Sequence, residues 1–169
     1  MNSNRLLRLF FVTACVLFST AFLRAQQAKT WLMLNPYSQE SLFATDPVEQ
    51  ANLAKAGWKT NGEGYLLVSP AERSVLMERM VKATDKGIDR IFATSAATVS
   101  AAKKAGYHSE GVMGNVSAVR QATDMIPVYH LVQGERNLWL IDKADMPWAE
   151  KSGWKFKNVP FFLWAAVAP

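Results

Sequence analysis

The sequence predicts a mainly β fold of the α+β type, namely a pseudo-threefold, β-trefoil-like domain with a short helix in each repeat. The first observation is a short apolar block containing an aromatic residue, which recurs at residues 42–45, 91–94 and 138–141. The second is a block of lysine, a small residue, glycine and an aromatic residue, which ends at Trp58, Tyr107 and Trp154. Both blocks recur after 49 and then 47 residues. Periods of 20 to 50 residues are typical of repeated structural units.

Each repeat begins with two expected strands. The first strands are expected at 31–34, 76–80 and 128–131, where short runs are apolar or alternate in polarity. The recurring apolar blocks are the second strands, because aromatic and β-branched residues are enriched in strands. The two strands together form the first half of the repeat.

The second half of each repeat is an expected short helix followed by a returning strand. Asp46 and Ser95 can cap the first helical turn, and Gly57, Gly106 and Gly153 are suited to end the helix in the left-handed conformation. Apolar stretches at 65–68 and 160–164 are typical of the final strand.

Residues 71–83 allow two interpretations. Ser69, Pro70 and Glu72 have the order of a helix start, so these residues could form a helix in a fold of alternating strands and helices. The repeat alignment instead predicts a strand at 75–81. We favour the strand because the repeat signal spans the whole chain.

The predicted domain covers residues 26–169 in three repeats, at about 29–70, 71–118 and 119–169. Units of this size cannot bury a core alone, and a closed arrangement removes the exposed strand edges that promote aggregation. A β-trefoil is the compact solution for three such units.

Residues 1–25 have the pattern of a secretory signal peptide. Arg5 and Arg8 precede an uncharged apolar run at 9–23, and Ala25 offers a cleavage position. We therefore expect an extracytoplasmic protein, periplasmic or secreted. An uncleaved N-terminal membrane anchor is the alternative, because Leu23 is a poor residue three positions before cleavage.

The composition excludes several classes of protein. A single cysteine, Cys15, excludes a disulfide scaffold and a thiolate metal cluster. Without the signal, 16 basic and 14 acidic residues remain, and they are scattered. Nucleic-acid binding requires a concentrated basic stripe, so we expect no nucleic-acid partner.

The repeat blocks resemble a family of extracytoplasmic bacterial repeats. Units of that family read Val-Tyr-Arg-Leu-Tyr-Asn, His-Phe-Tyr-Thr-Thr, a helix, Ala-Gly-Trp and Tyr-Glu-Gly, and the best matches here are residues 128–131, 92–95 and 105–111. The family is of unknown function and occurs beside secreted lipases, peptidases and cell-wall hydrolases. The resemblance implies a secreted accessory domain. Its recurrent His is replaced by Leu42, Ile91 and Leu138 here.

No catalytic motif is found in the sequence, and we expect neither a cofactor nor a metal. The serine hydrolase elbow, the zinc-binding His-Glu-x-x-His motif and the phosphate-binding glycine loop are all missing. His108 and His130 are the only histidines. A hydrolase that uses one of them is the enzymatic alternative, because triad members need not be adjacent in sequence. We expect instead a surface or core-edge role for both.

The candidate ligand-binding residues are Trp148, Asp142 and Asp145. Trp148 lies where the other repeats have Asn52 and Ala101, so it could be an exposed platform for a sugar ring. The two carboxylates could accept hydrogen bonds from sugar hydroxyls. The alternative is that Trp148 fills a gap under its helix while the aspartates cap that helix.

The expected function is therefore a non-catalytic binding module outside the cytoplasm, monomeric, with a cell-wall or cell-surface saccharide as the first ligand to test. After signal cleavage we expect no membrane contact. A secreted hydrolase is one alternative, and a purely structural protein-contact domain is another.

Overall fold

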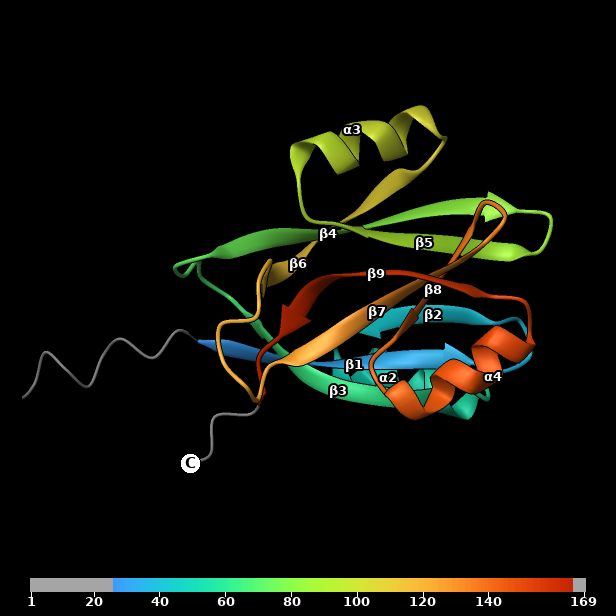
Figure 1. Cartoon of the computed structure of the whole chain (residues 1–169), viewed down its shortest axis with the longest axis horizontal. Coiled ribbons are helices and arrows are strands. Elements are labelled where there is room, and N and C mark those ends of the chain that lie inside the picture. The colour runs from blue at the N-terminus through green and yellow to red at the C-terminus, as the bar shows by residue number, and fades with distance from the viewer. Residues whose placement is uncertain (1–25, 166–169) are drawn as a thin grey trace, which may run out of the picture.

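The structure is a computed structural model that describes residues 26–165. The predicted signal peptide, residues 1–25, lies outside the described residues. The prediction of export therefore stays a prediction. Within residues 26–165 the fold is mainly β with short helices, as the sequence predicts (Figure 1).

The order strand, strand, helix, strand occurs three times along the chain. The first unit contains β1 (Gln27–Asn35), β2 (Glu40–Ala44), α2 (Pro47–Lys55) and β3 (Lys59–Leu67). The second contains β4 (Ser74–Thr84), β5 (Gly87–Ala93), α3 (Ala96–Lys104) and β6 (His108–Ser117). The third contains β7 (Ile126–Gln133), β8 (Arg136–Leu140), the 3-10 turn η1 (Lys143–Asp145), α4 (Met146–Lys151) and β9 (Lys155–Leu163).

In every unit the first strand lies between the other two. β1 pairs with β2 and β3, β4 with β5 and β6, and β7 with β8 and β9, always antiparallel. Between units, β6 is joined by one residue pair to β3 and by one to β9. These pairings describe one open, branched sheet, which does not by itself establish a trefoil.

The ambiguous segment of the second unit is a strand. β4 runs from Ser74 to Thr84, so the helical interpretation of residues 71–83 is wrong. Ser74 takes part in a turn, where its hydroxyl accepts from the amide of Ala71 and donates to the carbonyl of Ala71. A short local signal is thus overridden by sheet pairing on both sides of the strand.

The predicted helix boundaries are confirmed. The Asp46 side chain accepts from the amide of Val48, and the Ser95 side chain accepts from the amide of Thr98. Gly57, Gly106 and Gly153 have φ angles of 88°, 88° and 89°, in the left-handed region that favours glycine. α2 and α3 therefore begin at the predicted caps, and all three helices are followed by the predicted glycine, whereas α4 begins without a side-chain cap.

The centre of the molecule is an aromatic cluster to which each unit contributes one ring from its second strand. Phe43 and Phe92 contact edge to face with centroids 4.8 Å apart, and Phe92 and Trp139 do so at 5.1 Å. Phe161 packs beneath Phe43 and Trp139. All four rings are at most 3% exposed. The aromatic residue of this recurring block is therefore a core residue in all three units.

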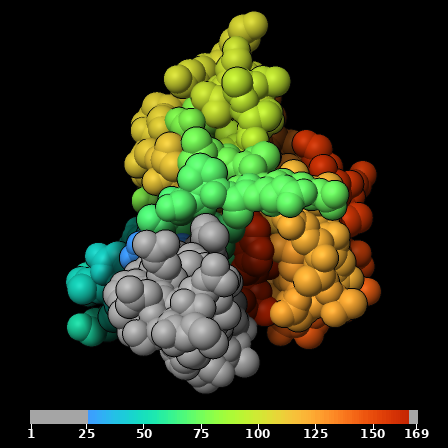
Figure 2. All heavy atoms as spheres, turned by 90° about the vertical axis from the view of Figure 1, so that its left-hand side faces the viewer, coloured from blue at the N-terminus to red at the C-terminus, as the bar shows by residue number. Residues whose placement is uncertain are grey.

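The three units surround this cluster. Strands β2, β5 and β8 contact one another pairwise, as do β3, β6 and β9. Figure 2 shows the green and yellow residues of the second unit above, with the blue-cyan first unit and the orange-red third unit below. The helices pack against the strands of their own units, and α3 lies apart from the other two (Figure 1). Surfaces between units are therefore where residues distant in sequence meet.

Candidate functional site

A buried polar network connects the second and third units. Asp89 on β5 is only 5% exposed and accepts hydrogen bonds from both the amide and the side-chain nitrogen of Asn137, each at 2.8 Å. The hydroxyl of Tyr107 also donates to Asp89. Because Asp89 and Asn137 belong to different units, this network fixes the second unit against the third.

The Tyr107 ring gives the network an aromatic wall. Burial raises the pKa of the Tyr107 phenol well above its ordinary value, and its hydrogen bond to Asp89 raises it further. The phenol therefore stays protonated and remains a donor. The ammonium group of Lys82 lies 5.7 Å from the ring centroid, in the range of a cation–π contact.

His130 extends the network into the core. Its ring stacks on Trp139 with centroids 4.1 Å apart and an interplanar angle of 4°, and its Nε2 lies 2.7 Å from the side-chain oxygen of Asn137. The side chain is 7% exposed. These contacts support a structural role at the edge of the core, whereas His108 is exposed at the start of β6.

The position of His130 in the repeat requires a correction. When the first strands expected at 31–34 and 128–131 are aligned residue by residue, His130 lies opposite Met33, and in the second unit it lies opposite Arg79. The pairings match Leu32 with Phe43, Arg79 with Phe92 and His130 with Trp139, so the equivalent of His130 in the first unit is Leu32. A shift of one residue in a strand exchanges the two faces of the sheet.

We expect the protein to lose stability as the pH falls below about 6.5, the ordinary pKa of histidine. Burial lowers the pKa of His130, so the unfolded chain binds a proton more readily than the folded one. The histidine contribution is then fully present above the unfolded pKa and is lost as the pH falls through the folded pKa. Urea denaturation from pH 7 to pH 5 measures this dependence.

The matched controls are His130→Gln and the same change at exposed His108. The slope of unfolding free energy against pH should decrease in His130→Gln and stay unchanged in His108→Gln. An unchanged slope in the His130 variant would show that other groups cause the pH dependence.

The rim above this network is polar and carries both charges. A pocket of about 410 Å³ opens between the β4–β5 and β7–β8 turns. Asp89 and Tyr107 line it together with the following side chains of the two turns: Lys82, Thr84, Asp85, Lys86, Gln133, Glu135 and Arg136. Lys82 and Glu135 lie 3.8 Å apart across the opening. The pocket offers donors and acceptors beside one aromatic ring.

Trp148 is not an open platform in this structure. It is partly buried and packs against the apolar cluster that contains Leu140, Ala149 and Trp154. The indole of Trp154 donates to Gln39 of the first unit at 3.0 Å. These contacts favour the interpretation in which Trp148 fills space under α4.

The two aspartates beside Trp148 already have partners. Asp142 is exposed, and its side chain accepts from the amide of Ala144 and so caps η1. Asp145 accepts from the side-chain amide of Asn61 at 2.6 Å, which connects the third unit to the first. Asp142 therefore caps the 3-10 turn that precedes α4 rather than α4 itself, whereas Asp145 stands at the start of α4 without a side-chain capping bond and binds Asn61 instead.

The sequence reasoning missed Asp89, Tyr107 and Asn137 as a group. Tyr107 was noted only as an aromatic in a recurring position, and Asp89 and Asn137 have no local motif. The available signal was a polar pair before each Phe-Ala-Thr-like block, at residues 40–41, 89–90 and 136–137. These pairs lie in the first halves of the second strands, which meet at the junctions between units.

Residues 29–164 match the domain of unknown function DUF5648. The chain belongs to this family. No curated protein and no solved structure matches the sequence. DUF5648 is a family of unknown function, so membership in it assigns no ligand to the pocket.

Two further findings concern the described residues alone. None of the helices within residues 26–165 is long and apolar enough to cross a membrane. The same part of the chain contains no group of three or more acidic, histidine or cysteine side chains that could hold a metal ion.

Proposed function

We propose that this DUF5648 domain is an exported, non-catalytic binding module that holds a neutral saccharide of the cell wall or cell surface in the pocket between its second and third units. The observation that carries the proposal is the mixed polar rim around Tyr107. Sugar hydroxyls both donate and accept, so they require side chains of both kinds beside an apolar ring face.

The charges of the pocket support a neutral ligand. Three basic side chains, Lys82, Lys86 and Arg136, face three acidic ones, Asp85, Asp89 and Glu135. An anionic polymer would need an excess of positive charge. The rigid floor supports binding, because Asp89 and Asn137 are already held by each other and by Tyr107.

The proposal also includes export of the protein and a trefoil-like closure of its three units. The signal-like residues 1–25 support export, followed by cleavage near Ala25. The contacts among equivalent strands support a trefoil-like closure of the three units, and the repeat blocks support a relation to secreted bacterial repeats. The alternative site beside Trp148 would use exposed Asp142 as its acceptor.

Binding to purified peptidoglycan and to a glycan array tests the proposal. We expect the exported protein to bind, and we expect Glu135→Gln combined with Lys86→Met to weaken binding about tenfold by removing the carboxylate and the ammonium group from the rim. Both side chains are exposed, so the variant should fold and melt like the natural protein.

Two controls separate this pocket from the other candidate site. Glu150→Gln with Lys143→Met makes the same chemical changes on exposed positions near α4 and should leave binding unchanged. Asp142→Asn preserves a capping side chain but removes its charge. Loss of binding in Asp142→Asn alone would favour the site beside Trp148, and no binding to any glycan would contradict the proposed function.

A further inference from the structure

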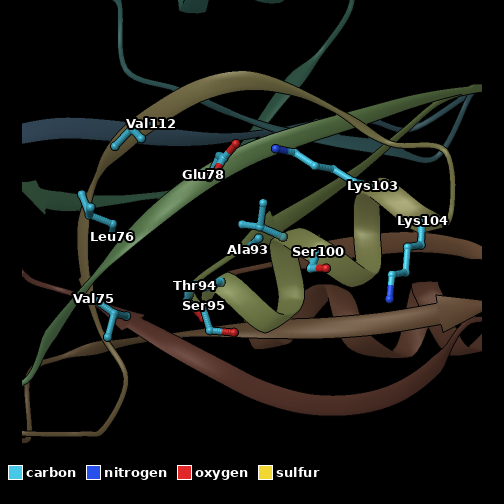
Figure 3. Close-up of a pocket in the computed structure, with 12 residues that line it drawn as sticks. Val75, Leu76, Glu78, Ala93, Thr94, Ser95, Ser100, Lys103, Lys104 and Val112 are labelled. Carbon is cyan, nitrogen blue, oxygen red and sulfur yellow. The ribbon is translucent and has the colours of Figure 1, made fainter.

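A second pocket lies between α3 and the face of β4 that is turned away from the central aromatic cluster, next to the small core cluster of Met80, Ala93 and Ala102. It has a volume of about 760 Å³. Its walls are mainly apolar, and Figure 3 shows Val75, Leu76 and Val112 at one end. Leu76 is 55% exposed and Val112 is 61% exposed. Neighbouring apolar side chains with this exposure in a groove are typical of a binding surface.

The groove exists because the second unit lacks an aromatic side chain that the other units have. Trp31, Glu78 and Tyr129 occupy equivalent positions on the first strands of the three units. Their partners on the second strands are Ala44, Ala93 and Leu140, respectively. Trp31 and Tyr129 are large and partly buried. Glu78 in this position leaves the space beneath α3 open.

The side chains around this position also differ in polarity between the first and second units. In the first unit Glu63 pairs with Trp31, and Lys29 forms an ion pair with Glu63 at 2.9 Å and lies over the Trp31 ring. In the second unit Val112 occupies the place of Glu63 and Leu76 the place of Lys29. An ion pair that covers an aromatic ring is thus replaced by two apolar side chains beside an open groove.

Charge is segregated along the groove. Lys103 and Lys104 lie on the last turn of α3, away from Val75, Leu76 and Val112, and Lys103 extends toward Glu78 while Lys104 extends to the other side (Figure 3). The groove therefore has an apolar end and a predominantly basic end. This polarity is complementary to a molecule with an apolar chain and an anionic head.

The floor of the groove offers few backbone partners to an extended peptide. β4 pairs with β6 at Ser74–Val81 and with β5 at Glu78–Thr84, so only Ser74–Met77 have no partner strand on the β5 side. A hydrocarbon chain needs no hydrogen bonds, and α3 and the strand face give it two walls. The volume of the groove is in the usual range of small-molecule sites, so it suits one hydrocarbon chain rather than the surface of a bilayer.

We propose that this groove binds one free fatty acid, with its hydrocarbon chain along Val75, Leu76 and Val112 and its carboxylate at the end of α3 that carries Lys103 and Lys104. This site is separate from the proposed saccharide pocket and does not depend on it. No covalent step is involved.

Calorimetric titration of the exported protein with monomeric dodecanoate tests the proposal. We expect a dissociation constant in the micromolar range, which a small apolar ligand of this size can reach. Leu76→Asp should weaken binding about tenfold or more, because it places a charge against the chain. Val68→Asp is the matched control, since Val68 is 52% exposed and does not line the groove, and it should bind dodecanoate normally.

The head group is tested by changing both partners. Lys103→Gln with Lys104→Gln should weaken dodecanoate binding about threefold, as expected for exposed charge pairs, and leave dodecanol binding unchanged. Dodecyltrimethylammonium should bind more weakly than dodecanoate. Equal binding of the two ions, normal binding by Leu76→Asp, or binding to lipid vesicles without binding to dodecanoate would each overturn the proposal. Melting temperatures equal to that of the unchanged protein show that the variants are folded.

Discussion

Replacing Trp139 by alanine is expected to remove a large part of the stability of the domain. Its ring is 3% exposed, contacts Phe92 and Phe161, and lies flat against His130. Its indole nitrogen donates to the carbonyl of Arg90 in the second unit at 2.9 Å. Truncating a buried tryptophan costs about 4 kcal/mol, and a domain has only about 5–15 kcal/mol in total. Urea denaturation followed by circular dichroism measures the loss.

The repeat itself provides the control. Phe43 and Phe92 occupy the positions equivalent to Trp139, so Trp139→Phe should fit the same central cluster. It still removes the donor to Arg90, and we expect a loss of about 1–2 kcal/mol. Alanine and phenylalanine variants of equal stability would show that the central cluster is not what stabilises the three units.

The order of elements could be predicted because its signals are local. Asp46 and Ser95 cap helices through amides two or three residues away, and Gly106 ends a helix through its own backbone angle. Each repeat then supplied an independent copy of the same pattern. Even residues 71–83, where a local helix signal competed, were assigned correctly as a strand because the other repeats have a strand there.

The junctions between units could not be predicted in the same way. Asp89 and Asn137 are 48 residues apart, and Tyr107 reaches them from the loop between α3 and β6. No spacing rule relates these positions before the units are placed beside one another. The one-residue error at His130 had a related cause, since only cross-strand pairing shows which face of a strand a residue occupies. The apolar groove could not be predicted for the same reason. Glu78 is seen to be unusual only when cross-strand pairing aligns it with Trp31 and Tyr129.

Of the changes considered, Asp89→Ala is expected to cause the second largest loss of stability after Trp139→Ala, although it removes a charged side chain rather than an apolar one. Three donors converge on its buried carboxylate, two from Asn137 and one from Tyr107. Alanine would leave them in a site that is only 5% exposed. Leaving a buried donor unpaired costs about 1–3 kcal/mol, so the combined loss should be about 3 kcal/mol or more.

A double-mutant cycle with Tyr107→Phe distinguishes lost hydrogen bonds from a simple loss of packing. In the natural protein Tyr107→Phe removes one satisfied hydroxyl and should cost about 1 kcal/mol. In the Asp89→Ala background the same hydroxyl has lost its carboxylate acceptor, so removing it should be neutral or stabilising. Contacting residues show such coupling, whereas independent ones add. Additive losses would mean that Asp89 does not hold Tyr107, and the wall of the proposed saccharide pocket would then be set by packing of the ring alone.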